Sequence, residues 1–168
     1  MGDIGDILFD DQYTNSVCNG TTAIRVAYSA QGQGPSYGCS YGPPCWWAGI
    51  YWQQPAGNWG TVPEAGFDLR SYNRLTFCAR GEVGGEQIEF GTGGIGRDSS
   101  NCSRIEPYPD SACKVSRWIT LTNQWQEYTL DLSSSNLSYV IGGFLWATNR
   151  NSNPGGAVFY VDEIRFER

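Results

Sequence analysis

The segment CWWAGIYWQQPAGNWG, residues 45–60, combines aromatic rings and side-chain amides at a density that an ordinary core strand does not require. It holds four of the chain's seven tryptophans, together with two glutamines and a glycine-marked turn. Aromatic rings can stack on the apolar C–H faces of sugar rings, while amides and carboxylates can hydrogen-bond sugar hydroxyls. These residue types therefore favour carbohydrate binding as the chemistry of this segment.

The alternation within residues 46–54 separates two sets of side chains if the segment is a strand. One set is apolar and is expected to face the core: Trp46, Ala48, Ile50 and Trp52. The other mixes rings with an amide and a glycine: Trp47, Gly49, Tyr51 and Gln53. Because a buried amide is costly unless it is hydrogen-bonded, we predict that the second set forms a binding face. The alternative is that Trp47 and Tyr51 only cover exposed sheet or pack beneath the loop at residues 31–44.

A second polar face is expected in EQIEFGTGG, residues 86–94. Ile88 and Phe90 share one parity, whereas Gln87, Glu89 and Gly91 share the other. If this strand lies beside residues 46–54, the two outward faces converge on a shallow cleft. In that cleft we predict stacking rings and hydroxyl-binding groups at Tyr51, Trp47, Gln53, Gln87, Glu89 and, from the following turn, Trp59.

A catalytic alternative requires a second carboxylate on the same surface as Glu89. Glycosidases generally use two carboxylates that flank the scissile bond. Glu82, Glu86 and Asp98 are available nearby in the sequence, but their spacing does not indicate a pair. The chain has no histidine, so a Ser-His-Asp triad is excluded. A jelly-roll glycoside hydrolase or lyase is therefore the second hypothesis, and an adhesion or other protein-binding sandwich is the third.

Length and charge narrow the class of protein further. The 168 residues fit a single domain, residues 1–168, and the formal net charge is −6. Since nucleic acids and anionic membranes attract basic surfaces, we expect neither as a partner. No apolar run approaches the roughly 18 residues of a membrane span, and no signal peptide is recognisable at the start of the sequence.

Six cysteines indicate disulfides rather than a zinc site, because CxxC pairs and histidines are absent. Cys39 and Cys45 enclose two prolines, as do Cys102 and Cys113, so both pairs can close local loops. Cys18 and Cys78 then pair only by elimination, and other connectivities stay open. Disulfides predict an oxidising compartment, and we expect a secreted protein.

Period-two alternation recurs along the chain and predicts an all-β fold. The expected strands are residues 24–29, 46–54, 74–80, 86–92, 117–121, 127–132, 140–147 and 157–166. Gly, Pro, Ser and Asn clusters separate them, and no segment has a helical stripe. The expected architecture is a two-sheet antiparallel β-sandwich, or jelly roll. The long segments at residues 31–44 and 93–113 are expected to be loops, either functional or merely decorative.

Six motifs in this order resemble the galactose-binding-like jelly-roll domains classed as carbohydrate-binding modules. They are WAGIYWQQPAGNWG, FDLRSYNRLTFCARGE, IEFGTGGI, ITLTNQWQEYTLDLS, VIGGFLWATN and AVFYVDEIRFE. The resemblance implies a β-sandwich that binds glycans non-catalytically on a concave face and forms part of a larger secreted polysaccharide-degrading protein. The expected ligand is a β-glucan or a related plant or microbial polysaccharide.

The resemblance also implies a structural calcium ion between the first and last strands. Asp10, Asp11 and Asp162 are the positions to which this expectation extends, and carboxylate oxygens are suitable calcium ligands. The alternative is that these residues are solvated charges at strand ends.

Overall fold

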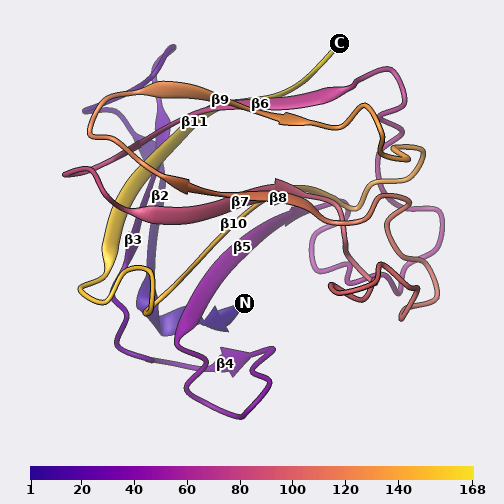
Figure 1. Ribbon diagram of the computed structural model, residues 1–168, viewed down its shortest axis with the longest axis horizontal. Helices are drawn as coiled ribbons and strands as arrows, with labels where there is room; N and C mark the ends of the chain where they lie inside the picture. Colours follow the sequence, from indigo (N-terminus) through magenta and orange to yellow (C-terminus); the bar gives the residue numbers. More distant parts are fainter.

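Two antiparallel sheets packed face to face account for nearly all of the regular structure (Figure 1). The computed structural model describes all residues, 1–168. The six-stranded sheet has the order β4 (Ser36–Tyr37), β1 (Gly2–Asp3), β5 (Trp47–Gln53), β10 (Gly142–Asn149), β7 (Gln87–Thr92) and β8 (Val115–Thr120). The five-stranded sheet has the order β2 (Ile7–Tyr13), β3 (Ala23–Tyr28), β11 (Ala157–Glu167), β6 (Arg74–Gly81) and β9 (Gln126–Asp131).

The core between the sheets is strongly aromatic, because inward positions of several strands carry rings. Phe77 on β6 meets Phe90 on β7, with ring centroids 4.8 Å apart, and Trp146 on β10 meets Phe159 on β11 at 5.1 Å. All four side chains are fully buried. Rings at these separations stabilise the packing beyond the burial of their area, so the core holds the two sheets in a fixed relation.

The predicted β-sandwich is confirmed, and the eight expected strands lie within about two residues of the observed ones. Alternation did not predict β1, β2, β4 or the short 3-10 turn Ile4–Asp6. The assumption that the two polar strands are neighbours is wrong, because β10 lies between β5 and β7. No helix is long and apolar enough to be a membrane span.

Trp46 is a second correction. It was expected in the core, but 41% of its surface is exposed. The backbone at Trp46 has a φ of 59°, so the alternation of β5 starts only at Trp47. The Arg150 guanidinium lies 4.5 Å above the Trp46 ring and fixes it outside the sandwich.

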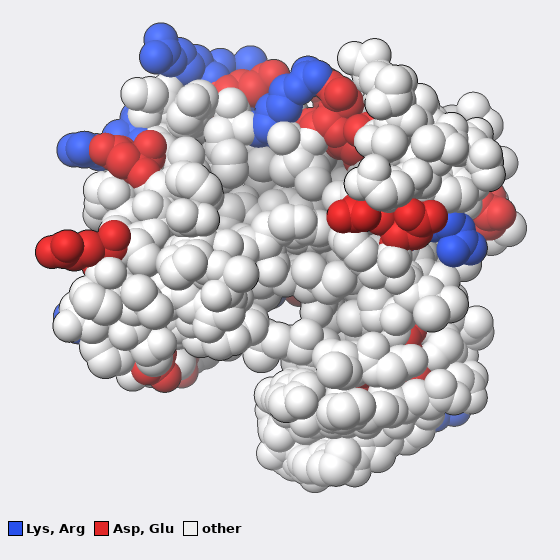
Figure 2. All heavy atoms as spheres, turned by 180° about the vertical axis from the view of Figure 1, so that it is seen from behind, with Lys and Arg blue, Asp and Glu red and all other residues white.

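The three predicted disulfides are confirmed: Cys18–Cys78, Cys39–Cys45 and Cys102–Cys113. The first ties the β2–β3 loop to β6. The second closes the loop that follows β4, within a stretch, residues 31–46, that has no charged residue. Figure 2 shows charged side chains along the margins of one face, while the projecting lower lobe is mostly uncharged.

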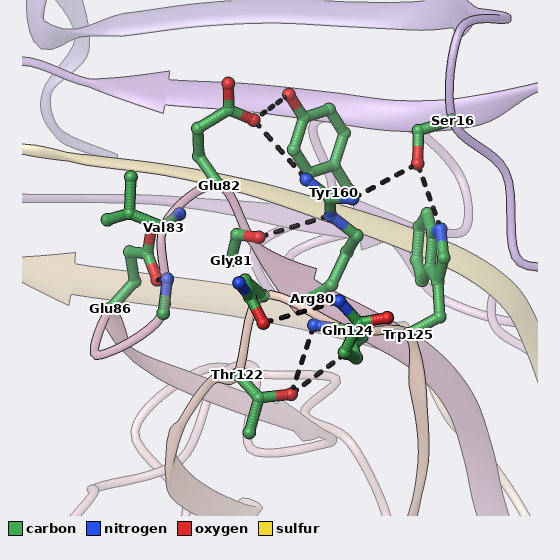
Figure 3. A network of polar contacts seen from close by, with 12 residues as sticks. Ser16, Arg80, Gly81, Glu82, Val83, Glu86, Thr122, Gln124, Trp125 and Tyr160 are labelled. Atoms are coloured by element: carbon green, nitrogen blue, oxygen red, sulfur yellow. Dashed lines mark hydrogen bonds and ion pairs between the residues drawn. The ribbon is translucent and has the colours of Figure 1, made fainter.

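Polar contacts cover the part of the outer face of the five-stranded sheet that surrounds Tyr160 (Figure 3). The Tyr160 hydroxyl donates to Glu82, and the Arg80 guanidinium lies 4.8 Å above the Tyr160 ring. Ser16, from the loop that Cys18 anchors, accepts hydrogen bonds from Arg80 and from the Trp125 indole. Only 2% of the Tyr160 surface is exposed to solvent. We call this group of residues the Tyr160 network.

Candidate functional site

The outer face of the six-stranded sheet forms a floor of small residues with rings at its sides. The strand register aligns two rows of outward side chains: Gly49, Ala147, Glu89 and Trp118 in one, and Tyr51, Leu145, Gly91 and Ser116 in the other. Opposed side chains on neighbouring strands lie close together. Residues from four strands therefore form one surface.

Glycine is required at two places in this floor. A Cβ at Gly49 would lie 2.7 Å from the Trp146 carbonyl oxygen, and one at Gly91 would lie 2.6 Å from that of Val115. Neither backbone atom can move without disturbing the sheet. Because these two positions have no side chain, a ligand can approach the backbone at the centre of the floor.

Four rings border this floor. Trp47 and Tyr51 project from β5, Trp59 from the following turn, and Trp118 from β8. Tyr51 and Trp59 meet edge to face with centroids 5.8 Å apart. Trp59 is 41% exposed and Trp118 45% exposed, so their faces remain available for stacking.

The floor and two loops enclose a cleft of about 960 Å³. The loop between β7 and β8 forms one wall, which lies at the right of Figure 1 together with the turn after β5. The Tyr108 amide donates to the Gly60 carbonyl at 2.7 Å, joining that turn to the wall. This volume lies within the range of small-molecule sites and admits a segment of a polymer.

Glu89 is the charged group at the centre of the cleft. Its Oε1 lies 2.7 Å from Lys114 Nζ and accepts a hydrogen bond from Ser116 Oγ at 2.6 Å. Both contacts are to the same oxygen, which leaves Oε2 to accept from a ligand. Only 15% of the side chain is exposed, so a hydrogen bond to this carboxylate is partly shielded from water.

The Tyr51 hydroxyl stays protonated over a wide pH range. Burial raises its pKa above the ordinary tyrosine value, and the negative charges of Glu89 and Asp110 raise it further. The neutral hydroxyl can both donate and accept a hydrogen bond.

The structure brings together four of the six predicted sugar-contacting residues. Trp47, Tyr51, Trp59 and Glu89 all line the cleft. Gln53 instead belongs to the turn, because its Oε1 accepts from the Gly57 amide at 3.0 Å. Gln87 is exposed on the same sheet face as Glu89 but lies beyond the lining.

Sequence reasoning did not single out Trp118 or Lys114. A signal for Trp118 was available: residues 116, 118 and 120 alternate as Ser, Trp and Thr, which places a ring on a polar face. Lys114 had no such signal, since it precedes the strand and reaches Glu89 only through the pairing of β7 with β8.

Two of the three carboxylates weighed as partners of Glu89 in the catalytic alternative lie outside the cleft. Glu86 accepts from the Val83 and Gly84 amides, and Glu82 belongs to the Tyr160 network; neither lines the cleft. Asp98 does line it, but hydrogen bonds from Ser100 and Asn101 lower its pKa. A general acid needs a raised pKa, so Asp98 is unsuited to that role.

The predicted calcium ligands do not fit a shared site. Asp162 accepts from the amides of Cys18 at 2.8 Å, Asn19 at 3.1 Å and Glu163 at 2.8 Å. Asp10 accepts from the Gln12 amide. Both oxygens of Asp162 thus have donors already, and β3 lies between β2, which carries Asp10 and Asp11, and β11, which carries Asp162. We therefore derive no calcium site from these three residues.

One other cluster has the spacing of metal ligands, at Asp3, Cys39 and Cys45. Its sulfurs form a disulfide, and the Asp3 carboxylate accepts from Ser36 Oγ and from the Cys45 and Trp46 amides. These contacts give it a structural role.

A two-sheet sandwich with a ring-lined cleft on an outer sheet face is the arrangement expected of a carbohydrate-binding module. The family model described as carbohydrate binding domain 30 matches residues 5–167. The chain belongs to this family, and its function is non-catalytic carbohydrate binding.

Solved structures agree with this fold. A family 30 carbohydrate-binding module is 17% identical, with 99% of this chain and 80% of that chain covered and a TM-score of 0.61. The family 30 module of the cellulosomal cellulase Cel9D-Cel44B of Clostridium thermocellum is 19% identical over 94% and 79% of the two chains, with a TM-score of 0.54. The Clostridium thermocellum family 11 module in complex with a β-1,3-1,4-mixed-linked tetrasaccharide is 14% identical over 96% and 81%, with a TM-score of 0.53. No significant match was found among curated proteins.

Proposed function

We propose that the cleft binds internal segments of a β-glucan or a related plant or microbial polysaccharide. The observation that carries this proposal is the floor of small residues between exposed rings, with Glu89 Oε2 free at its centre. Tyr51, Trp47, Trp59 and Trp118 would stack on successive sugar rings, and Glu89 would accept from their hydroxyls. The mixed-linked tetrasaccharide bound by the family 11 module supports this choice of ligand.

Gln53 and Gln87 do not line the cleft, and the proposal gives them secondary roles. Gln87 is exposed on the β7 face and can reach a chain that extends beyond the cleft. Gln53 would act indirectly, by holding the turn that carries Trp59.

We further propose that residues 1–168 are one binding domain of a larger secreted glycan-degrading protein, which it brings to its substrate. Three disulfides support an oxidising compartment. The cellulase module of Clostridium thermocellum supports the pairing with an enzyme.

Affinity electrophoresis against a panel of soluble polysaccharides tests the ligand. We expect the wild-type protein to be retarded in gels that contain mixed-linked β-glucan, and Trp118→Ala to migrate nearly freely because it lacks an exposed stacking ring. Trp125→Ala, which removes a ring from the opposite face, is the matched control and should be retarded like the wild type. Equal migration of the wild-type protein with and without every polysaccharide would overturn the proposal.

A further inference from the structure

The wall of the cleft contains no strand, although it supplies much of the binding surface. Residues 94–102, 105, 106 and 113 account for 12 of the 23 residues that line the cleft. A loop of this length loses considerable conformational entropy when it is ordered. Something must therefore hold it against the sheet before a ligand arrives.

Asp110 makes that connection. Its side chain has no exposed surface, and its Oδ2 accepts from the Ile95 amide at 2.7 Å, at the start of the wall. Its Oδ1 accepts from the Ile141 amide and, at 3.4 Å, from the Gly142 amide, where β10 begins. In return the Asp110 amide donates to the Ile95 carbonyl at 2.8 Å. One carboxylate thus joins the wall to the strand that carries Leu145 and Ala147 of the floor.

Arg97 extends this anchor through the wall. Its guanidinium donates to the carbonyl oxygens of Asp110, of Cys102 at 3.0 Å and of Ser111 at 3.4 Å. The Cys102–Cys113 disulfide closes the same segment. These contacts fix the wall internally. The Asp110 side chain joins it to the first residues of β10, beside backbone hydrogen bonds from Gly93 to Gly142 at 2.7 Å and from Ser111 to Tyr139 at 2.7 Å.

Asp110 does not line the cleft, so a bound sugar would not touch it. A buried carboxylate is costly unless its oxygens are paired. Burial raises the pKa of Asp110, and hydrogen bonds from three backbone amides, together with the charge of Arg97, offset only part of that effect. A purely apolar side chain would avoid that cost, but it would leave the amides of Ile95 and Ile141 without acceptors.

We propose that Asp110 is a positioning residue that sets the glycan affinity of the cleft by holding the β7–β8 wall against the start of β10. The proposal rests on the proposed function. Without this carboxylate, the wall would sample open positions and bound glycan would have to order it, which lowers the apparent affinity.

Asp110→Asn and Asp110→Ala test this idea in a graded way. Asparagine keeps one acceptor oxygen and alanine keeps none. We expect affinity for a mixed-linked β-glucan oligosaccharide, measured by titration calorimetry, to fall about tenfold for Asp110→Asn and further for Asp110→Ala. Asp131→Asn changes an exposed carboxylate at the end of β9, which accepts from the Ser133 amide, and this variant should bind like the wild type.

Amide hydrogen exchange separates positioning from general destabilisation. The Ile95 and Ile141 amides should lose protection in the Asp110 variants, while core amides of β6 such as Phe77 stay protected. If Asp110→Ala does not fold, Asp110→Asn, which keeps one acceptor oxygen, provides the test, and wild-type affinity together with unchanged Ile95 protection in that variant would overturn the proposal.

Wild-type affinity in folded Asp110→Ala would overturn the proposal, as would unchanged protection of the Ile95 amide. Equal loss of protection throughout the sandwich would assign Asp110 a purely structural role and also contradict it. Absence of binding by the wild-type protein would instead count against the proposed function.

Discussion

The outer faces of the two sheets have similar compositions but differ in whether their polar groups and rings are available to a ligand. Each presents tyrosine and tryptophan beside carboxylates and cationic side chains. On the five-stranded sheet, Tyr160 and Glu82 satisfy each other, and Ser16 accepts from Arg80 and Trp125. On the six-stranded sheet, Glu89 has an unused oxygen and Trp118 an exposed ring.

This difference shows that aromatic and polar composition does not by itself identify a binding face. The β2–β3 loop, held by Cys18–Cys78, lies over part of the five-stranded sheet, and the polar groups around Tyr160 pair with one another. The glycines of the six-stranded sheet and the loop beside it keep the opposite face open. A binding face is therefore recognised by polar groups and rings that the protein itself leaves unpaired.

The largest expected effect concerns the closed face. Tyr160→Ala should lower the free energy of unfolding by roughly 3–5 kcal/mol, because it removes a fully buried ring and leaves Arg80 without its stacking partner. Urea denaturation measures this change. Glycan affinity of the folded variant should equal that of the wild type, and a loss of binding would contradict the division between the two faces.

A smaller effect is expected at the centre of the open face. Glu89→Gln should weaken glycan binding about tenfold, because the charged acceptor is lost and Lys114 is left without its carboxylate. Titration calorimetry provides the measurement. Glu167→Gln, which removes the partner of Arg74 at 3.2 Å on the other sheet, is the control and should have no effect.

The smallest expected effect is that of alkaline pH. Tyrosine ordinarily titrates near pH 10, but burial and the charges of Glu89 and Asp110 raise the pKa of Tyr51. The neutral form is therefore retained as pH rises through the ordinary value. Affinity measured at about pH 7 and pH 10 should agree within about twofold, and a steep loss near pH 10 would contradict this expectation.

Local alternation was enough to predict much of the open face. Residues 47–53 separate Tyr51 from Trp52 within a single strand, and this depends only on the two-residue period of β structure. The same period separates Glu89 from Phe90. Trp46 was misplaced because its left-handed backbone interrupts the period one residue before the strand begins.

Long-range pairing was not readable from these patterns. Nothing in the sequence of β5 or β7 places β10 between them, and the wall at residues 93–113 has no period from which its position could be derived. Gln53 was also not predictable from alternation alone. It lies on the predicted face, but its side chain accepts a hydrogen bond from the Gly57 amide in the turn that follows.

The most direct test of the account compares two neighbours on β5, Tyr51→Ala and Trp52→Ala. Tyr51 borders the cleft beside Trp59, whereas the Trp52 ring lies 5.5 Å from Phe144 and packs against the core. Glycan affinity and urea stability of both variants should be measured together. We predict that Tyr51→Ala loses most affinity with little change in stability, and that Trp52→Ala loses roughly 3–5 kcal/mol of stability while its folded form still binds. Unfolding by Tyr51→Ala, together with loss of binding in a stable Trp52→Ala protein, would contradict the assignment of the two faces.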